Sequence, residues 1–294
     1  MRNKKATFLF CLFIFFYNLQ FSVALSDHFE NLNNLSPHPP KSFNHRAVKN
    51  YIIKELKKNN ANVKVDEFTY QNQILGSSKG YNIIAEFEGR KEKKIAFATH
   101  WDTRPIAEND LNYKNRNKPI IGANDGNSST AVLLKLSEHL SSKKLEYTVI
   151  LLFFDAEDSG INKEGYCIGS KKYVENHDIN FVYGILIDMI GDKNLTIKKE
   201  GFSKLYATKI VNNIWNIARQ KFNYKFFKNS SWGNIIDDHY SFLKKGVPFV
   251  NIIDFDYIYW HTTKDIPENC SVTNMRKIYR LLKYISTNPG ALLK

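Results

Sequence analysis

Cysteine is scarce in this chain of 294 residues, which contains only Cys11, Cys167 and Cys270. So few cysteines exclude the disulfide framework of a small secreted domain, and none has the spacing of a cysteine-based metal site. A disulfide between Cys167 and Cys270 is chemically allowed in an exported protein, and two free buried thiols are equally compatible with the sequence.

The N-terminal apolar run is too short for a spanning helix. It covers residues 6–17, whereas a membrane span needs about 20 residues. Arg2, Lys4 and Lys5 precede it and small residues follow near 22–24, the pattern of a secretory signal peptide. We predict a signal over residues 1–25, export to the periplasm or the medium, and no stable membrane insertion after cleavage. An uncleaved N-terminal anchor is the alternative.

A basic stripe with interleaved aromatic residues is not evident either. The chain carries 42 Lys and Arg against 29 Asp and Glu, a formal net charge of +13, but the basic residues look scattered along it. We therefore expect no nucleic-acid partner. A solvated basic surface is the simplest interpretation, and weak attraction to anionic surfaces stays open.

What the chain does have is enough apolar residues, 43%, for a sizeable core. The polar, proline-containing segment 26–43 predicts a flexible N-terminal segment, and residues 44–294 predict one domain. Helical periodicity is present in residues 45–60, 207–222 and 275–287.

Several runs have the composition of β-strands. Residues 63–70 alternate like a strand, and 81–89 and 93–102 are separated by a charged turn that predicts a hairpin. Residues 147–158, 184–192 and 247–256 contain nearly continuous apolar runs, typical of strands buried on both faces. Strands alternating with helices predict an α/β fold, a three-layer α/β/α sandwich with a mixed, mostly parallel central sheet.

Histidine and carboxylate residues follow these runs or sit in a glycine-rich turn. A lone polar residue in such a place is usually a cap or turn former. Five such residues in the order His, Asp, acidic, Asp, His are harder to explain as caps and turn formers. Because the ends of parallel strands meet at one edge of an open sheet, the five side chains would lie together there. Imidazole and carboxylate suit zinc, and Glu157, beside the third position, suits a general base. The five candidate ligands are His100, Asp125, Asp158, Asp188 and His261.

The segments HWD, GANDG, DAEDSG, IDMIGD and WHTTKD resemble the metal segments of the M28-type zinc aminopeptidase superfamily. The resemblance runs from about residue 45 to the C-terminus and is stronger to glutaminyl-peptide cyclotransferases (glutaminyl cyclases) of the bacterial form. Two features favour that branch: the segment IIDDHYSFLKKGVPFVNII, and Trp260 directly before His261.

The resemblance implies one zinc per chain and a role for each site residue. Asp125, Asp158 and His261 would bind the zinc. Asp158 departs from the family pattern, in which a Glu is usual, but it keeps the carboxylate donor. Glu157 would be the general acid/base, in a carboxylate hydrogen-bond network with Asp188 and Asp237.

Aromatic residues suit the substrate pocket of such an enzyme. Trp260 is the first candidate, with Trp101 and Tyr257 as weaker ones for which core packing is the alternative. We expect the substrates to be peptides or proteins with an N-terminal glutamine, cyclised to pyroglutamate with loss of ammonia, and we expect a monomer.

The alternative enzyme is an M28-type aminopeptidase with two zinc ions. In that case His100 and Asp188 complete a second metal site and Asp125 bridges the two ions. We interpret His239 as a residue that satisfies a buried backbone carbonyl rather than a carboxylate of the network, and Asp265 as a turn residue behind the ligands.

Overall fold

The fold is described from a computed structural model, which covers residues 23–161 and 165–294. The predicted signal peptide lies almost entirely outside the described residues. Among those residues, no helix combines the length and the apolar character needed to cross a membrane.

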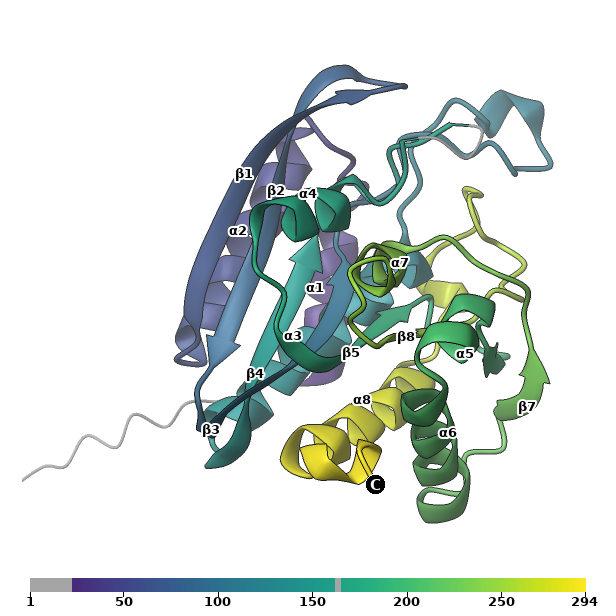
Figure 1. The fold of residues 1–294 in the computed structure, drawn as a ribbon. Helices are drawn as coiled ribbons and strands as arrows, with labels where there is room; N and C mark the ends of the chain where they lie inside the picture. The colour runs from purple at the N-terminus through teal and green to yellow at the C-terminus, as the bar shows by residue number, and fades with distance from the viewer. Residues whose placement is uncertain (1–22, 162–164) are drawn as a thin grey trace, which may run out of the picture.

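A six-stranded sheet forms the centre of the molecule, in the order β1-β2-β4-β3-β5-β8 (Figure 1). Strands β4, β3, β5 and β8 run parallel, while β1 and β2 add an antiparallel edge. A small parallel pair, β6 and β7, lies outside this sheet. The strand bounds are β1 Asn62–Asn72, β2 Gly76–Phe87, β3 Gly89–His100, β4 Leu145–Phe154, β5 Phe181–Asp188, β6 Ile197–Lys199, β7 Phe227–Ser231 and β8 Phe249–Ile253.

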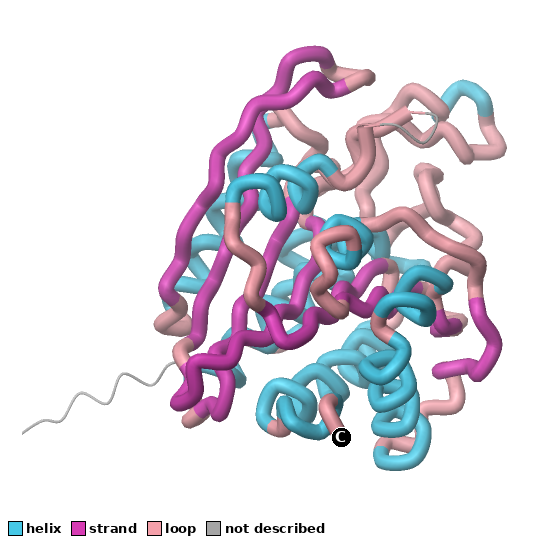
Figure 2. The backbone as a smooth tube through the Cα atoms, in the orientation of Figure 1, coloured by secondary structure: helices cyan, strands magenta, loops and turns pink. Residues whose placement is uncertain are grey.

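Helices cover both faces of the sheet (Figure 2). Helices α1, α2, α3 and α8 pack on one face, and α4, α5 and α7 lie on the other. The predicted three-layer sandwich with a mostly parallel sheet is confirmed. The helix bounds are α1 Leu25–Asn34, α2 Phe43–Lys58, α3 Ser129–Ser141, α4 Ile168–Asn176, α5 Gly201–Tyr206, α6 Thr208–Asn216, α7 Asp238–Leu243 and α8 Val272–Thr287, with shorter turns at Tyr113–Asn115, Ala123–Ser128, Ile217–Lys221, Pro267–Asn269 and Pro289–Leu292.

The predicted hairpin between residues 81–89 and 93–102 is wrong. Strand β4 inserts between β2 and β3, pairing antiparallel with the former and parallel with the latter. The side chains of β4 are buried at nearly every position, so its apolar run is accommodated best with partners on both edges and helices on both faces. Gly89 permits the crossing, since a Cβ there would lie 2.2 Å from the carbonyl carbon of Tyr147.

The segment 26–43 is not the flexible tail that its composition predicts. Residues Leu25–Asn34 form α1, and its apolar side chains Leu25, Phe29 and Leu32 are buried in the main core. Spaced three or four residues apart, they form one helical stripe. Helix α1 packs mainly on α3, so this part of the chain belongs to the folded domain.

Candidate active site and metal centre

The five candidate ligands meet at the carboxyl edge of the parallel strands. His100 is the last residue of β3 and Asp188 the last of β5. Asp158 follows β4, His261 follows β8, and Asp125 lies in the turn before α3. The structure therefore brings together all five residues, as their positions after successive strands predict.

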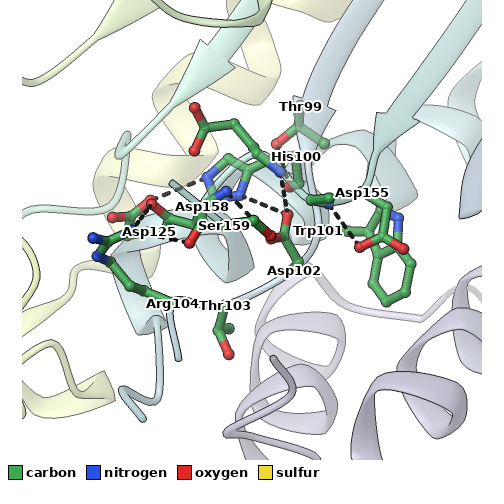
Figure 3. Close-up of polar contacts among 12 residues, drawn as sticks. Thr99, His100, Trp101, Asp102, Thr103, Arg104, Asp125, Asp155, Asp158 and Ser159 are labelled. Carbon is green, nitrogen blue, oxygen red and sulfur yellow. Dashed lines mark hydrogen bonds and ion pairs between the residues drawn. The ribbon is translucent and has the colours of Figure 1, made fainter. Parts of the chain in front are cut away.

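These residues form two overlapping groups of possible metal ligands. Asp125, Asp158 and His261 form one, and His100, Asp125 and Asp188 form the other, with the ligand atoms of each group within 4.8 Å of one another. The Nε2 atom of His261 lies 3.1 Å from Asp158 Oδ1 and 3.8 Å from Asp125 Oδ2. The Nε2 atom of His100 lies 3.0 Å from Asp125 Oδ1 (Figure 3) and 3.2 Å from Asp188 Oδ1. Asp125 thus lies between the two groups.

The first group fits a bound cation. The Oδ2 atoms of Asp125 and Asp158 are buried, and among the described residues neither has a hydrogen-bond partner. An unsatisfied buried carboxylate oxygen is costly, and a metal ion would supply the missing interaction. Two carboxylates and one imidazole, with a position left for substrate, form a donor set typical of catalytic zinc.

The charges of this cluster perturb its protonation. Burial, reinforced by Asp158, raises the pKa of Asp125 to about 8. Burial also acts on Asp158, but the nearby cationic groups, His261 first and then Arg104 and His100, together outweigh it and hold the pKa of Asp158 below its usual range. The contact with Asp158 raises the pKa of His261 to about 9 against the effect of burial. Such crowding of carboxylates favours a cation, which would hold them in the ionised form.

A chain of contacts behind His261 fixes its ring. Glu108 Oε1 lies 2.7 Å from His261 Nδ1, so Nε2 is left to face the metal position. Arg104 donates from Nε to both Glu108 oxygens at 2.8 Å and from Nη1 to the backbone oxygen of Asp158 at 3.0 Å. Histidine ligands commonly have such a carboxylate on the second ring nitrogen.

Two further carboxylates hold the ligand loops through backbone amides. Asp102 accepts from the N–H groups of Glu157 and Asp158 at 3.1 and 3.3 Å. Asp265 accepts from the N–H groups of Asn124 and Asp125 at 2.8 and 3.1 Å. These contacts agree with the expected place of Asp265 in a turn behind the ligands.

Glu157 lies beside the metal groups and is surrounded by other carboxylates. Burial raises its pKa well above the usual value, and Asp158 adds to the shift. The thiol of Cys167 donates to Glu157 Oε1 at 3.1 Å. Glu157, Cys167 and Asp237 offer donor atoms within 4.8 Å of one another.

The hydrogen bonds of Asp188 and Asp237 differ from the predicted network, in which these two residues and Glu157 bond to one another. Within the described ranges, Asp188 is bonded to His100, and Asp237 accepts from Asn251 Nδ2 at 2.7 Å. Burial raises the pKa of Asp237 to about 6, with Asp188 as the next cause. Asp237 therefore interacts through its charge with both Glu157 and Asp188, and no hydrogen bond among the described residues joins the three carboxylates.

The metal groups open into a cavity of about 410 Å³. Glu157 and Asp237 are among its polar lining residues, and Trp260 is among its apolar ones, with its ring centroid 4.1 Å from that of His261. The remaining lining residues are Asp125, Asp158, Tyr166, Asp188, Met189, Asn234, Ile235, Ile236, Ile253, Phe255 and His261.

The other two aromatic candidates do not line this cavity. Trp101 is buried, donates from Nε1 to Tyr81 O and stacks on His45 at 4.4 Å between ring centroids; Figure 3 shows it on the side of Asp155, away from Asp125. Tyr257 is buried and donates to Asp265 at 2.8 Å. Both are packing residues, the alternative that the sequence left open.

The structure also shows the partner of His239 and the state of the two cysteines. His239 Nε2 lies 2.9 Å from Glu200 Oε2, so its partner is a buried carboxylate rather than the backbone carbonyl we expected. Cys167 and Cys270 are both free and buried, which excludes a disulfide between them in this structure.

Sequence reasoning missed Glu108, Asp102, Cys167 and Glu200. Asp102 follows His100 by two residues, which is a usable signal for a supporting carboxylate. Glu108 lies 153 residues before His261, and nothing in either local segment indicates that they touch.

Comparison with known proteins agrees with this architecture. The model of peptidase family M28 matches residues 82–286. Tannerella forsythia glutaminyl cyclase superposes with a TM-score of 0.85 at 30% identity, over 90% of this chain and 97% of that chain. A Zn-dependent exopeptidase from Parabacteroides distasonis gives 0.86 at 29% identity, over 90% and 97%.

A curated relative extends the similarity outside bacteria. The glutaminyl-peptide cyclotransferase of Drosophila melanogaster is 24% identical over 93% of this chain and 84% of that protein. The sequence resemblance to the M28 superfamily and its cyclase branch is thus confirmed, and the zinc-dependent neighbour agrees with the ligand set. Because the family model covers well over half of the sequence, the chain belongs to peptidase family M28.

Proposed function

We propose that this protein is a zinc-dependent glutaminyl-peptide cyclotransferase, which converts the N-terminal glutamine of peptides and proteins to pyroglutamate and releases ammonia. The observation that carries this proposal is the pairing of two features in one cavity. Glu157 and Asp237 face a pocket walled by Trp260, and the ligand group of Asp125, Asp158 and His261 lies beside them. The 30% identity to a bacterial glutaminyl cyclase supports it.

A single zinc is favoured by the distribution of unsatisfied oxygens. Both orphaned atoms, Asp125 Oδ2 and Asp158 Oδ2, belong to the group completed by His261. Asp125 is shared by both groups, so the contrast depends on Asp158 Oδ2, because among the described residues neither oxygen of Asp188 is a buried atom without a partner. Zinc bound by Asp125, Asp158 and His261 would supply Lewis-acid polarisation of the substrate's γ-carbonyl.

The residues of the chain account for the proton transfers. The α-amine of the substrate forms a bond to the side-chain carboxamide carbon (Cδ) of the same residue, and the bond from that carbon to the amide nitrogen breaks. Glu157 takes one proton from the amine and delivers one to the departing nitrogen, so that ammonia leaves and Glu157 is regenerated. Its raised pKa suits a group that alternates between base and acid near neutral pH.

The cavity would hold the substrate in the cyclic pose. The reaction is intramolecular, so its rate depends on the fraction of glutamine side chains folded back on their own amine. Trp260, half-buried beside His261, supplies a flat apolar wall for the methylene carbons. Asp237 adds negative charge near Glu157 and helps to keep its pKa high.

The test is mass spectrometry of a Gln-initiated peptide incubated with the zinc-loaded protein. We expect the loss of one ammonia with the chain otherwise intact. Removal of whole residues, with the Gln-peptide left uncyclised, would refute the proposal.

The second candidate is an aminopeptidase with two zinc ions. One observation favours it: His100, Asp125 and Asp188 form a complete second ligand group that shares Asp125 with the first. Elemental analysis of the purified protein distinguishes the two candidates by one or two zinc ions per chain.

The proposal also covers the cellular location and the oligomeric state of the enzyme. The basic and apolar pattern of residues 1–25 supports export through a cleaved signal, and the catalytic domain predicted for residues 44–294, which α1 extends on its N-terminal side, would act as a monomer. Size-exclusion chromatography with light scattering, and N-terminal sequencing of the exported protein, test these two points.

A further inference from the structure

The net charge of the chain is concentrated in its last third. Residues 26–192 contain 22 Lys and Arg and 22 Asp and Glu, whereas residues 193–294 contain 17 basic and seven acidic residues. The basic residues are spread along the whole chain, but acidic residues balance their charge in residues 26–192 and not in residues 193–294.

Burial makes the imbalance at the surface larger still. Five of the seven acidic residues of this part are buried, and two, Asp256 and Glu268, are exposed. Asp256 is already paired with Lys198 at 2.8 Å. The five buried ones are Glu200, Asp237, Asp238, Asp254 and Asp265.

One exposed face collects many of these positive charges. On α8, Arg276, Arg280 and Lys283 recur at a spacing of four and three residues and are exposed, so they project from the same side of the helix. The opposite side carries Met275, Ile278, Leu282 and other buried residues.

The loop after Lys221 extends this face. Lys221 Nζ lies 4.6 Å from the ring centroid of Tyr284, and Lys277 Nζ lies 5.4 Å from that of Phe226. Residues 221–226 therefore lie against α8. We call the exposed residues Lys221, Lys225, Arg276, Arg280 and Lys283 the C-terminal basic face.

Helix α8 begins near the active-site edge, where the N–H of Ser271 donates to Gly191 O at 2.7 Å, and its C-terminal part extends toward the opposite end of the sheet. Tyr183, near the start of β5, donates to Pro289 O just after α8, whereas Asp188, at the end of the strand, lines the cavity. Five residues of strand span about 17 Å. In Figures 1 and 2, α6 and α8 lie together below the sheet, and the loops that follow the strands lie above it.

We propose that the C-terminal basic face docks the enzyme on an anionic phospholipid bilayer, with the cavity turned toward the solvent. Three points favour a lipid surface over an acidic peptide or a nucleic acid. The charges spread over about 10 Å of α8 and an adjacent loop, which matches an extended surface. The site stays accessible to peptides. The N-terminal pattern of export would bring the protein to a cell envelope.

The experiment is co-sedimentation of the purified protein with vesicles of phosphatidylcholine alone or mixed with phosphatidylglycerol. The difference between the two vesicles isolates the charge effect, since an apolar N-terminal segment would bind both. The basic-face variant carries Lys225→Glu, Arg276→Glu and Lys283→Glu, whose side chains are exposed. The control variant carries Lys54→Glu, Lys57→Glu and Lys64→Glu, with the same change of net charge in the balanced part.

We expect the parent protein to prefer the anionic vesicles and to lose that preference at high salt. Each basic side chain at an anionic surface contributes about fivefold to partitioning, so the basic-face variant should bind roughly 100-fold more weakly. The control variant should bind nearly as the parent does. Circular dichroism and thermal unfolding verify that both variants fold.

Three results would overturn the proposal. Equal binding of the parent to both vesicles would exclude a charge-dependent lipid partner. Equal losses in the two variants would mean that net charge, and not this face, governs binding. Tight binding of polyglutamate or duplex DNA with no vesicle binding would identify the occupant as an acidic polymer.

Discussion

Glu108 gives the sharpest test of the metal centre, because no sequence motif identifies it. Its carboxylate lies 2.7 Å from Nδ1 of His261 and is held by Arg104. Replacing it by alanine should leave the His261 ring free to rotate and should lower the basicity of Nε2. The prediction is weaker zinc binding by a chain whose proposed zinc ligands are all intact.

The structure sets the size of the effect. A hydrogen bond to a charged group contributes about 1.5–3 kcal/mol. The side chain of Glu108 is 34% exposed, so solvent screening places the expected loss near the lower limit, about tenfold in zinc affinity. Glu108→Gln keeps a neutral acceptor and should lose less than Glu108→Ala.

Zinc affinity is measured by competition with a chromophoric chelator, and unfolding by urea reports separately on stability. Glu175→Gln serves as the control, since Glu175 is an exposed carboxylate paired with Lys172 at 2.8 Å on α4. If Glu108→Ala binds zinc as tightly as the parent, Glu108 does not orient His261 and the reasoning fails.

Four further outcomes follow from the structure. Glu157→Gln should lower kcat by about 10²–10⁴-fold with zinc content unchanged; activity equal to the parent would remove Glu157 as the proton carrier. Cys167→Ala should lower kcat and Cys167→Ser should restore most of it, because serine keeps a donor toward Glu157 Oε1; equal rates for the two would make the thiol a packing residue. Trp260→Ala should raise KM more than it lowers kcat, and the reverse pattern in steady-state kinetics would contradict its role as a wall. Burial lowers the pKa of His28 to about 4, so the neutral ring contributes stability above pH 6.5 that is lost as the pH falls toward 4, at most about 3 kcal/mol. In urea unfolding, the free energy of unfolding of His28→Gln should therefore depend less steeply on pH than that of the parent. An unchanged pH dependence would exclude His28 as the cause.

The sequence was most informative where one local pattern determines one local structure. Apolar runs identified β4, β5 and β8, and helical periodicity identified α2 and α8. The polar residue after each run then predicted the site, because all parallel strands end at the same edge. His100 and Asp188 at the last positions of their strands show how direct that inference is.

Prediction from the sequence failed where contacts between distant parts of the chain determine the structure. Residues 81–102 have the pattern of a hairpin, and only the insertion of β4, more than 40 residues later, separates the two strands. Helix α1 was missed because its polar composition hides a stripe of three apolar residues that α3 covers. The partner of His261 was missed because Glu108 is close to it only in the folded chain.

The loop after β8 combines two tasks in one short segment. Trp260 walls the cavity, His261 is a metal-ligand candidate, and Asp265 accepts from the backbone of Asp125 and from Tyr257. A mutation that reshapes the pocket at Trp260 therefore also disturbs the position of a ligand one residue away. For directed evolution this means that substrate range and metal retention will change together, and libraries at Trp260 should be screened for both.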